Sequence, residues 1–238
     1  MLDQGEKTMS AKQSRLISKV LSPALGLWLR SQVQQVSDLL VKISGSDRQI
    51  LSGYIPYVSI SAHHAIYRGL HLTQIQLVAE SIRINLAAVL RGQSLRLLEP
   101  VPVMSEMVLQ ELDLNASLQS SLLSNALTDL LSTTLLPANC PIDGPISWHQ
   151  VSIDSGQLVL AATLKATGLE KPKPVVVRTG LQLASNHELQ LEHPQIQMGE
   201  LRRDLESLKL DLGPEVDLQT LHLSPGQIIC HGRINVIP

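Results

Sequence analysis

One apolar spacing recurs three times in the chain, and it limits the possible folds more than any other feature. Each copy has the form apolar-x-apolar-x-x-apolar-x-apolar: Leu70, Leu72, Ile75 and Leu77; Met107, Leu109, Leu112 and Leu114; Val216, Leu218, Leu221 and Leu223. In a flat strand, the extra residue would turn the second pair to the opposite face. A β-bulge or a sharp bend would keep both pairs on one face. The spacing therefore predicts strands that bend around an interior, unless both faces of each strand are covered.

Alternation of apolar and polar residues, which is typical of strands, extends over most of the remaining sequence. We expect further strands at residues 82–86, 148–153, 158–164, 175–183, 189–198 and 228–236. Helical spacing occurs at residues 10–21, 22–40, 115–136 and 200–210. Pro23 either begins the second of these helices or kinks one long helix. The pattern predicts an α+β fold in which a long curved antiparallel sheet wraps around amphipathic helices.

The interior of such a fold must be built from aliphatic side chains. Hydrophobic residues make up 44% of the 238 positions, whereas aromatic residues make up 2% and phenylalanine is absent. A chain of this length can bury a full core within one domain. We expect a flexible tail at residues 1–9 and a single domain at residues 10–238, with two halves joined near residues 137–145 as the alternative.

Charge and cysteine usage limit the partners and the compartment. The net charge is −2, with no basic patch of the kind that nucleic-acid binding requires. Cys140 and Cys230 lie far apart and form no CxxC, which favours free thiols in a reducing compartment. The apolar run at residues 20–29 is broken by Pro23 and Gly26, so it resembles neither a signal peptide nor a membrane span. We expect a cytoplasmic protein.

The common catalytic motifs, GxSxG, HExxH, the Walker loop and GxGxxG, do not occur in the sequence. His63, His64 and His71 form a cluster, but adjacent strand residues point to opposite faces, so solvated histidines are favoured over a metal site. Glu111 and Asp113 could serve acid–base chemistry or line a polar outer face. We expect no enzyme, cofactor or metal. A hydrolase whose serine and histidine meet only in the fold is the remaining catalytic alternative.

Two features place cations where a membrane or a phosphate could meet them. The expected first helix carries Lys12, Arg15 and Lys19 on one face and Leu16, Ile17 and Val20 roughly opposite. We expect the cations to hold anionic headgroups while the apolar residues dip into the membrane interface. The alternative is a helix packed on its own domain. Arg91 and Arg96 lie between a short helical turn and a strand, where they could bind a phosphate or be ordinary surface arginines.

All three tyrosines of the chain fall in one segment, GYIPYVSISAHHAIYRG at residues 53–69. Gly53 and Pro56 predict a turn at residues 54–57. Tyrosine has an apolar body and a polar tip, so it suits the mouth of an apolar groove. We therefore expect Tyr54, Ile55, Tyr57 and Tyr67 to form a rim for lipid, with Trp28 nearby and His63 or His64 bound to a headgroup. The alternative is that the tyrosines close one end of the fold.

Five segments, in this order, resemble the LmeA-like phospholipid-binding family of bacterial proteins, in the branch without a secretion signal. They are LSPALGLWLRSQVQQV (21–36), DRQILSGYIPYVSISA (47–62), YRGLHL (67–72), INLAAVLRGQSLRLLEPVPV (84–103) and LDLNASLQSSLL (112–123). The resemblance runs from about Leu16 to the C-terminus. It implies a tubular, TULIP-like lipid-binding fold, with a long helix held against curved sheet around an apolar groove. Envelope members of the family are exported, so the resemblance leaves the compartment and the lipid class open.

A groove lined by aliphatic side chains can bind acyl chains, because each buried methylene contributes about 0.8 kcal/mol. We expect this groove to be lined by residues of the first apolar copy, the following strand and the central helix: Leu70, Leu72, Ile75, Leu77, Ile82, Ile84, Leu127 and Leu131. A filled leucine core would have the same composition. The expected function is non-enzymatic binding or transfer of phospholipid or glycolipid at a membrane surface. A scaffolding protein that docks a protein partner is the alternative.

Overall fold

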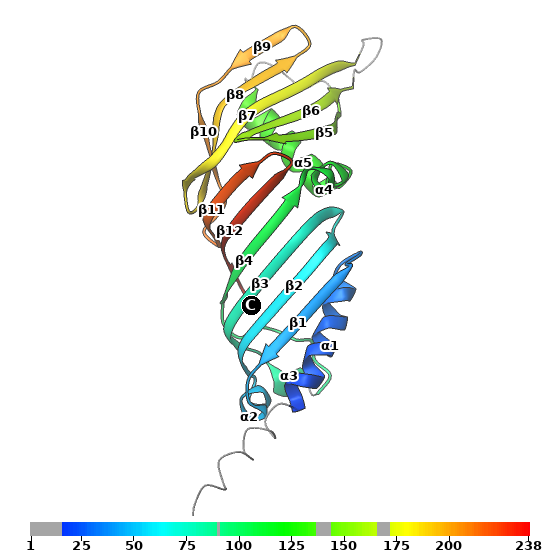
Figure 1. The fold of residues 1–238 in the computed structure, drawn as a ribbon, viewed down its shortest axis with the longest axis vertical. Coiled ribbons are helices and arrows are strands. Elements are labelled where there is room, and N and C mark those ends of the chain that lie inside the picture. The colour runs from blue at the N-terminus through cyan, green and yellow to red at the C-terminus, as the bar shows by residue number, and fades with distance from the viewer. Residues whose placement is uncertain (1–15, 90, 137–143, 166–171) are drawn as a thin grey trace, which may run out of the picture.

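The computed structural model describes residues 16–89, 91–136, 144–165 and 172–238, and of these it gives the backbone alone for residues 16–21, 24 and 28. It contains two antiparallel sheets that follow one another along the long axis of the molecule (Figure 1). The first sheet has the order β1 (Asp38–Ser44), β2 (Tyr54–Tyr67), β3 (Leu70–Arg83), β4 (Val101–Gln110), β12 (Gln227–Val236) and β11 (Val216–Ser224). The C-terminal hairpin thus returns to the sheet that the N-terminal strands begin.

The second sheet is built from the middle of the chain. Its order is β10 (Leu208–Asp211), β8 (Glu188–Met198), β7 (Lys173–Ser185), β6 (Gln157–Leu164) and β5 (Ile146–Asp154), and β9 (Leu201–Asp204) also pairs with β8. The helices are α1 (Leu16–Gln32), α2 (Asp47–Leu51), α3 (Leu86–Val89), α4 (Glu111–Ser117) and α5 (Ser121–Asp129), which continues into the π-helical turn η1 (Leu130–Leu135). The expected α+β class, with antiparallel sheets and few helices, is confirmed.

The strands bend as the recurrent apolar spacing predicts, in two of its three copies. In β11 the register with β12 shifts between Leu218 and Thr220, which marks a bulge. In β3 the ladder with β2 skips the pair His64–Thr73 but keeps the same register on both sides, and His64 has a φ of 46°. The neighbouring pairs Ala62–Ile75 and Ala65–Leu72 both have a buried alanine. Leu72 and Ile75, the partners of these alanines, are both half-buried, as a local bend at His64 predicts.

The middle copy ends differently, because the chain leaves the sheet. Strand β4 stops at Gln110, and Glu111 begins helix α4, so Leu112 lies on a helix and is 81% exposed. Side chains of α4 then tie the two sheets together. Asn115 binds both backbone groups of Val151 in β5, with both distances 2.8 Å, and Asp113 accepts a hydrogen bond of 2.5 Å from the Thr73 hydroxyl in β3.

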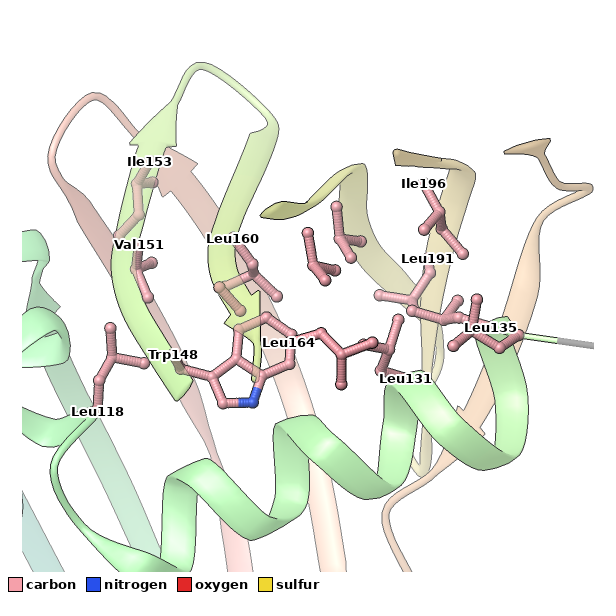
Figure 2. Close-up of a cluster of buried hydrophobic side chains, with 14 residues drawn as sticks. Leu118, Leu131, Leu135, Trp148, Val151, Ile153, Leu160, Leu164, Leu191 and Ile196 are labelled. Atoms are coloured by element: carbon pink, nitrogen blue, oxygen red, sulfur yellow. The ribbon is translucent and has the colours of Figure 1, made fainter. Parts of the chain in front are cut away.

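The second sheet has a buried, largely aliphatic core. Figure 2 shows Leu131 and Leu135 of the α5–η1 helix directed toward the strands, with the indole of Trp148 between helix and sheet. Trp148 is 3% exposed, and its Nε1 donates a hydrogen bond of 3.0 Å to Thr128 Oγ1. Ser120 caps this helix by accepting a hydrogen bond from the Leu123 N–H. The cap separates α5 from α4 and divides the single helix that was expected at residues 115–136.

Two other helix expectations need correction. Residues 33–40 do not continue the first helix, because residues 38–44 pair as β1 with the edge of β2. The helix expected at residues 200–210 is wrong, since β9 and β10 pair with the two halves of β8. In both segments, hydrogen bonding to an open strand edge outweighs the local helical spacing. Pro23 lies inside α1, so the alternative of one long helix describes the structure.

Candidate functional site

An apolar cavity of about 430 Å³ lies on the first sheet, between the sheet and helix α1. This volume is in the range typical of small-molecule sites. The lining residues come from α1, four strands and the segment before β4: Leu25, Leu29, Ile55, Val58, Ile60, Leu77, Ala79, Ile82, Ile84, Leu95, Arg96, Leu97, Val101, Val103 and Val236. All of these except Arg96 are aliphatic, so the cavity presents hydrocarbon to its contents.

A bend at one position of the β2–β3 ladder aims both halves of these strands into the cavity. The ladder skips the pair Pro56–Ser81, and Ser81 has a φ of 54°. Beyond this point Ile55 and Ile82 form a pair, and before it Val58 and Ala79 form another. Without the bend, the two pairs would face opposite sides of the sheet. Since all four residues line the cavity, the bend is what produces its curved wall.

Residues 94–98 form a segment at the edge of the cavity, here called the rim segment, and Asn85 holds it in place. The Arg96 N–H donates to Asn85 Oδ1 at 2.8 Å, and the Asn85 N–H donates to the Arg96 carbonyl at 3.2 Å. Asn85 Nδ2 also donates to the Ser94 carbonyl at 2.9 Å. The Leu98 N–H donates to the Arg83 carbonyl at 2.9 Å. These bonds fix the backbone on both sides of the lining residue Leu95.

Arg96 is the single charged residue among those that line the cavity, and it is exposed to solvent. The neighbouring Arg83 is engaged elsewhere. Its Nε lies 3.5 Å from Glu99 Oε1, and its guanidinium lies 5.8 Å from the centre of the Tyr54 ring. The cavity therefore has an aliphatic wall and one cation at its solvent boundary.

The structure brings together part of the expected groove. Ile55, Leu77, Ile82 and Ile84 all line the cavity. Leu70, Leu72 and Ile75 lie farther along β3 and are not among its lining residues. Leu127 and Leu131 pack in the core of the second sheet, as Figure 2 shows for Leu131. The grouping of Leu127 and Leu131 with the β3 residues in one groove is therefore corrected, because α5 covers the other sheet.

The tyrosines do not gather at one mouth. The turn expected at residues 54–57 is wrong, because these residues begin β2, and Tyr67 ends the same strand. Tyr54 and Tyr57 are half-buried, and the Tyr54 hydroxyl lies 3.2 Å from Ser81 Oγ. Tyr67 is 40% exposed, with the Arg68 guanidinium 5.4 Å from its ring centre. Ile55 lines the cavity, whereas Tyr54, Tyr57 and Tyr67 are not among its lining residues.

Several expected site residues fall outside the part of the chain that the structure describes. Lys12 and Arg15 precede it, and Leu16, Ile17, Lys19 and Val20 are described only as backbone in the first turns of α1. Trp28 likewise lies on α1 without a described side chain. The assignment of these residues to a membrane surface or a rim stays a prediction. Cys140 also lies outside the described residues.

Sequence reasoning missed most of the cavity wall. Ile55 was expected at a rim, whereas Val58 and Ile60 were missed, although all three follow the same broken alternation as the recurrent copies. Leu95 and Leu97 gave no comparable signal, because the rim segment belongs to no strand or helix long enough to show a period. Val103 reaches the cavity through the pairing of β4 with β3, and Val236 reaches it through the pairing of β12 with β4.

The other polar candidates have structural partners or no cluster around them. Glu111 Oε2 accepts a hydrogen bond of 2.7 Å from the Ile153 N–H, which fixes α4 to β5. Among the described residues, no group of three His, Cys, Asp or Glu side chains could hold a metal ion. Burial raises the pKa of the Cys230 thiol above its ordinary value. No helix within the described ranges is long and apolar enough to cross a membrane.

Comparison with protein-family models identifies the family of the chain. A family model described as LmeA-like phospholipid-binding matches residues 12–233, a range that includes every lining residue of the cavity except Val236. Comparison with curated proteins gave no match, and comparison with solved structures gave none either. Because the match extends over nearly the whole sequence, the chain belongs to the LmeA-like phospholipid-binding family.

Proposed function

We propose that the protein binds acyl chains of a phospholipid or glycolipid in the cavity beneath α1 and carries the lipid at a membrane surface without chemical change. The observation that carries this proposal is the cavity itself, whose lining is aliphatic except for Arg96. Its family, which is described as phospholipid-binding, supports the same ligand class.

The shape and chemistry of the wall suit a flexible hydrocarbon chain. Small and branched side chains, such as Ala79, Val58 and Ile82, leave a smooth surface without hydrogen-bonding groups. Such a surface gives no means of recognising a polar ligand, but each methylene that enters it contributes about 0.8 kcal/mol. The core of the second sheet, in which described aliphatic side chains pack with Trp148, acts as the support.

Helix α1 forms one side of the cavity through Leu25 and Leu29, and its first turns carry the basic residue Lys19. We propose that this end of the chain, with Lys12 and Arg15, meets the anionic lipids of a cytoplasmic membrane face. The membrane-facing element and the cavity wall would then be the same helix. Contact with the membrane could in this way bring the cavity close to its lipid.

The experiment is to purify the protein from cells without detergent and to examine it by native mass spectrometry and lipid extraction. We expect lipid that co-purifies in a fixed ratio. As a control, the same measurement is made on the variant Ala79→Trp, whose added ring occupies the cavity, and this variant should contain little lipid. A wild-type protein without lipid, which also fails to take up lipid from vesicles, would contradict the proposal and favour a scaffolding role.

A further inference from the structure

The cavity combines two chemical surfaces, and their combination restricts its ligand more than either one does. Fourteen of the fifteen lining residues are aliphatic, and the remaining one is Arg96 in the rim segment. An uncharged hydrocarbon gains nothing from a guanidinium at the boundary. A ligand with an apolar body and an anionic head would use both surfaces.

Within the part of the chain that the structure describes, the charge of Arg96 has no partner. Among the described residues, no carboxylate forms an ion pair with its guanidinium, and no described group accepts a hydrogen bond from it. The nearest acidic residue in sequence, Glu99, lies 3.5 Å from Arg83. Arg96 is therefore a solvated cation with its five N–H donors available for an outside acceptor.

The backbone of Arg96 is nevertheless fixed. Asn85 binds both its N–H and its carbonyl group, and the adjacent Leu97 pairs with Ile84 in a β-bridge. An exposed side chain on a fixed backbone searches a limited region, which here adjoins the open side of the cavity. Leu95 and Leu97 line the cavity on either side of it.

We infer that Arg96 binds the phosphate group of the ligand whose acyl chains occupy the cavity, so that the protein selects lipids with an anionic phosphate head. This inference rests on the proposed function. The planar guanidinium matches two phosphate oxygens at once, which gives a stronger and more directional contact than a lysine would. Arg96 thus sets the depth at which the lipid head stops, while the aliphatic wall holds the chains.

The test compares two short-chain lipids with identical acyl chains, a phosphatidylglycerol and an uncharged diacylglycerol, by equilibrium binding to the full chain. The variants are Arg96→Gln, which removes the charge, Arg96→Lys, which keeps the charge without the fork, and Arg91→Gln, a matched control outside the cavity lining. Inorganic phosphate is titrated separately. Thermal melting should be the same for all variants, because both arginines are exposed.

We expect Arg96→Gln to lower the affinity for the phosphatidylglycerol about tenfold, as loss of a charged hydrogen bond predicts, and to leave diacylglycerol binding unchanged. Arg96→Lys should fall between, and Arg91→Gln should match the wild type. An equal loss in Arg96→Gln and Arg91→Gln, or no loss in Arg96→Gln, would overturn the inference while leaving the cavity intact. Inorganic phosphate that binds at Arg96 without affecting lipid affinity would overturn it as well. Wild-type protein that binds neither lipid would overturn both the inference and the proposed function.

Discussion

Asn85 and Arg96 exchange two hydrogen bonds in opposite directions, from the Arg96 N–H to Asn85 Oδ1 at 2.8 Å and from the Asn85 N–H to the Arg96 carbonyl at 3.2 Å. Asn85 follows β3, whose last residues line the cavity, whereas Arg96 belongs to the rim segment. The pair therefore joins the rigid wall of the cavity to its edge. The Asn85 amide supplies hydrogen bonds to the backbone of the rim segment, which belongs to no strand or helix.

Replacing Asn85 by alanine removes the acceptor for the Arg96 N–H and the donor to the Ser94 carbonyl. Net hydrogen-bond contributions of about 1 kcal/mol each predict a loss of about 1–2 kcal/mol in unfolding free energy. A loosened rim should also weaken the binding of both charged and uncharged lipids several-fold. Urea denaturation and lipid titration check this, with Asn186→Ala in the β7–β8 turn as the control. Unchanged lipid affinity in Asn85→Ala would show that the rim segment does not shape the site.

The bend in β2 at His64 predicts a clear order of stabilities. His64 has a φ of 46°, a left-handed conformation that costs an ordinary residue about 1–2 kcal/mol. We expect His64→Gly to stabilise the protein slightly and His64→Val, which is β-branched, to destabilise it by about 1–2 kcal/mol. The control is His63→Val on the same strand, where extended backbone tolerates valine. Equal stabilities of His64→Gly and His64→Val in urea would mean that this backbone bend does not exist in solution.

The Cys230 thiol should be unreactive at neutral pH. Burial raises its pKa, so the thiolate fraction in the folded protein stays below that of a free thiol. The raised pKa also makes stability depend on pH. The folded state keeps the thiol proton while the unfolded state loses it, so the free energy of unfolding falls as pH rises above about 8.5. Reaction of the Cys140→Ser variant with a thiol reagent measures Cys230 alone. A rate at pH 8 equal to that of glutathione would contradict the prediction.

Binding to anionic vesicles should depend on Lys12, Arg15 and Lys19. Each cation near such a surface contributes about 1 kcal/mol, so replacing all three by glutamine should reduce binding strongly and remove most of its salt dependence. Cosedimentation with phosphatidylglycerol vesicles at two salt concentrations measures this. The control replaces Lys165, Arg178 and Arg202, three exposed cations of the second half, by glutamine. If both triple variants lose binding equally, the effect is one of net charge and the N-terminal helix has no special part.

The sequence predicted the sheets better than the helices, for a physical reason. Alternation and its interruptions are local, so most of the long strands and the bulge of β11 could be predicted from residue spacing, whereas part of β1 was expected in a helix. The helical three-and-four spacing of residues 200–210 is local too. This segment nevertheless forms strands, because its backbone pairs with β8. Whether such a segment becomes a helix or a strand depends on its pairing partner, and a single sequence does not identify that partner.

The candidate site was likewise predicted only in part from the sequence. Leu77, Ile82 and Ile84 were expected in the groove because they share one bent strand. Leu127 and Leu131 were assigned to the same groove, but the Ser120 cap and the anchors of α4 direct α5 to the second sheet. Arg96 could be recognised as a phosphate candidate, whereas its place among apolar side chains depends on Asn85 and on the fold of the rim segment.

The central claim is that acyl chains occupy the cavity, and filling the cavity tests it most directly. Ala79 lines the cavity between Val58 and Val103, whereas its neighbour Val78 pairs with the exposed Met104 and is not a lining residue. The variant Ala79→Trp places a ring inside, and Val78→Trp places the same ring on the other face of β3. Val103→Phe is a second filling variant, so that a poorly folded Ala79→Trp does not decide the result.

The measurement is equilibrium binding of a fluorescent fatty-acid probe to the delipidated proteins, with thermal melting to verify folding. We predict that wild type and Val78→Trp bind the probe with the same affinity and that the filling variants bind it at least tenfold more weakly, because the space for its methylenes is lost. Folded filling variants that bind the probe as tightly as Val78→Trp would contradict the account.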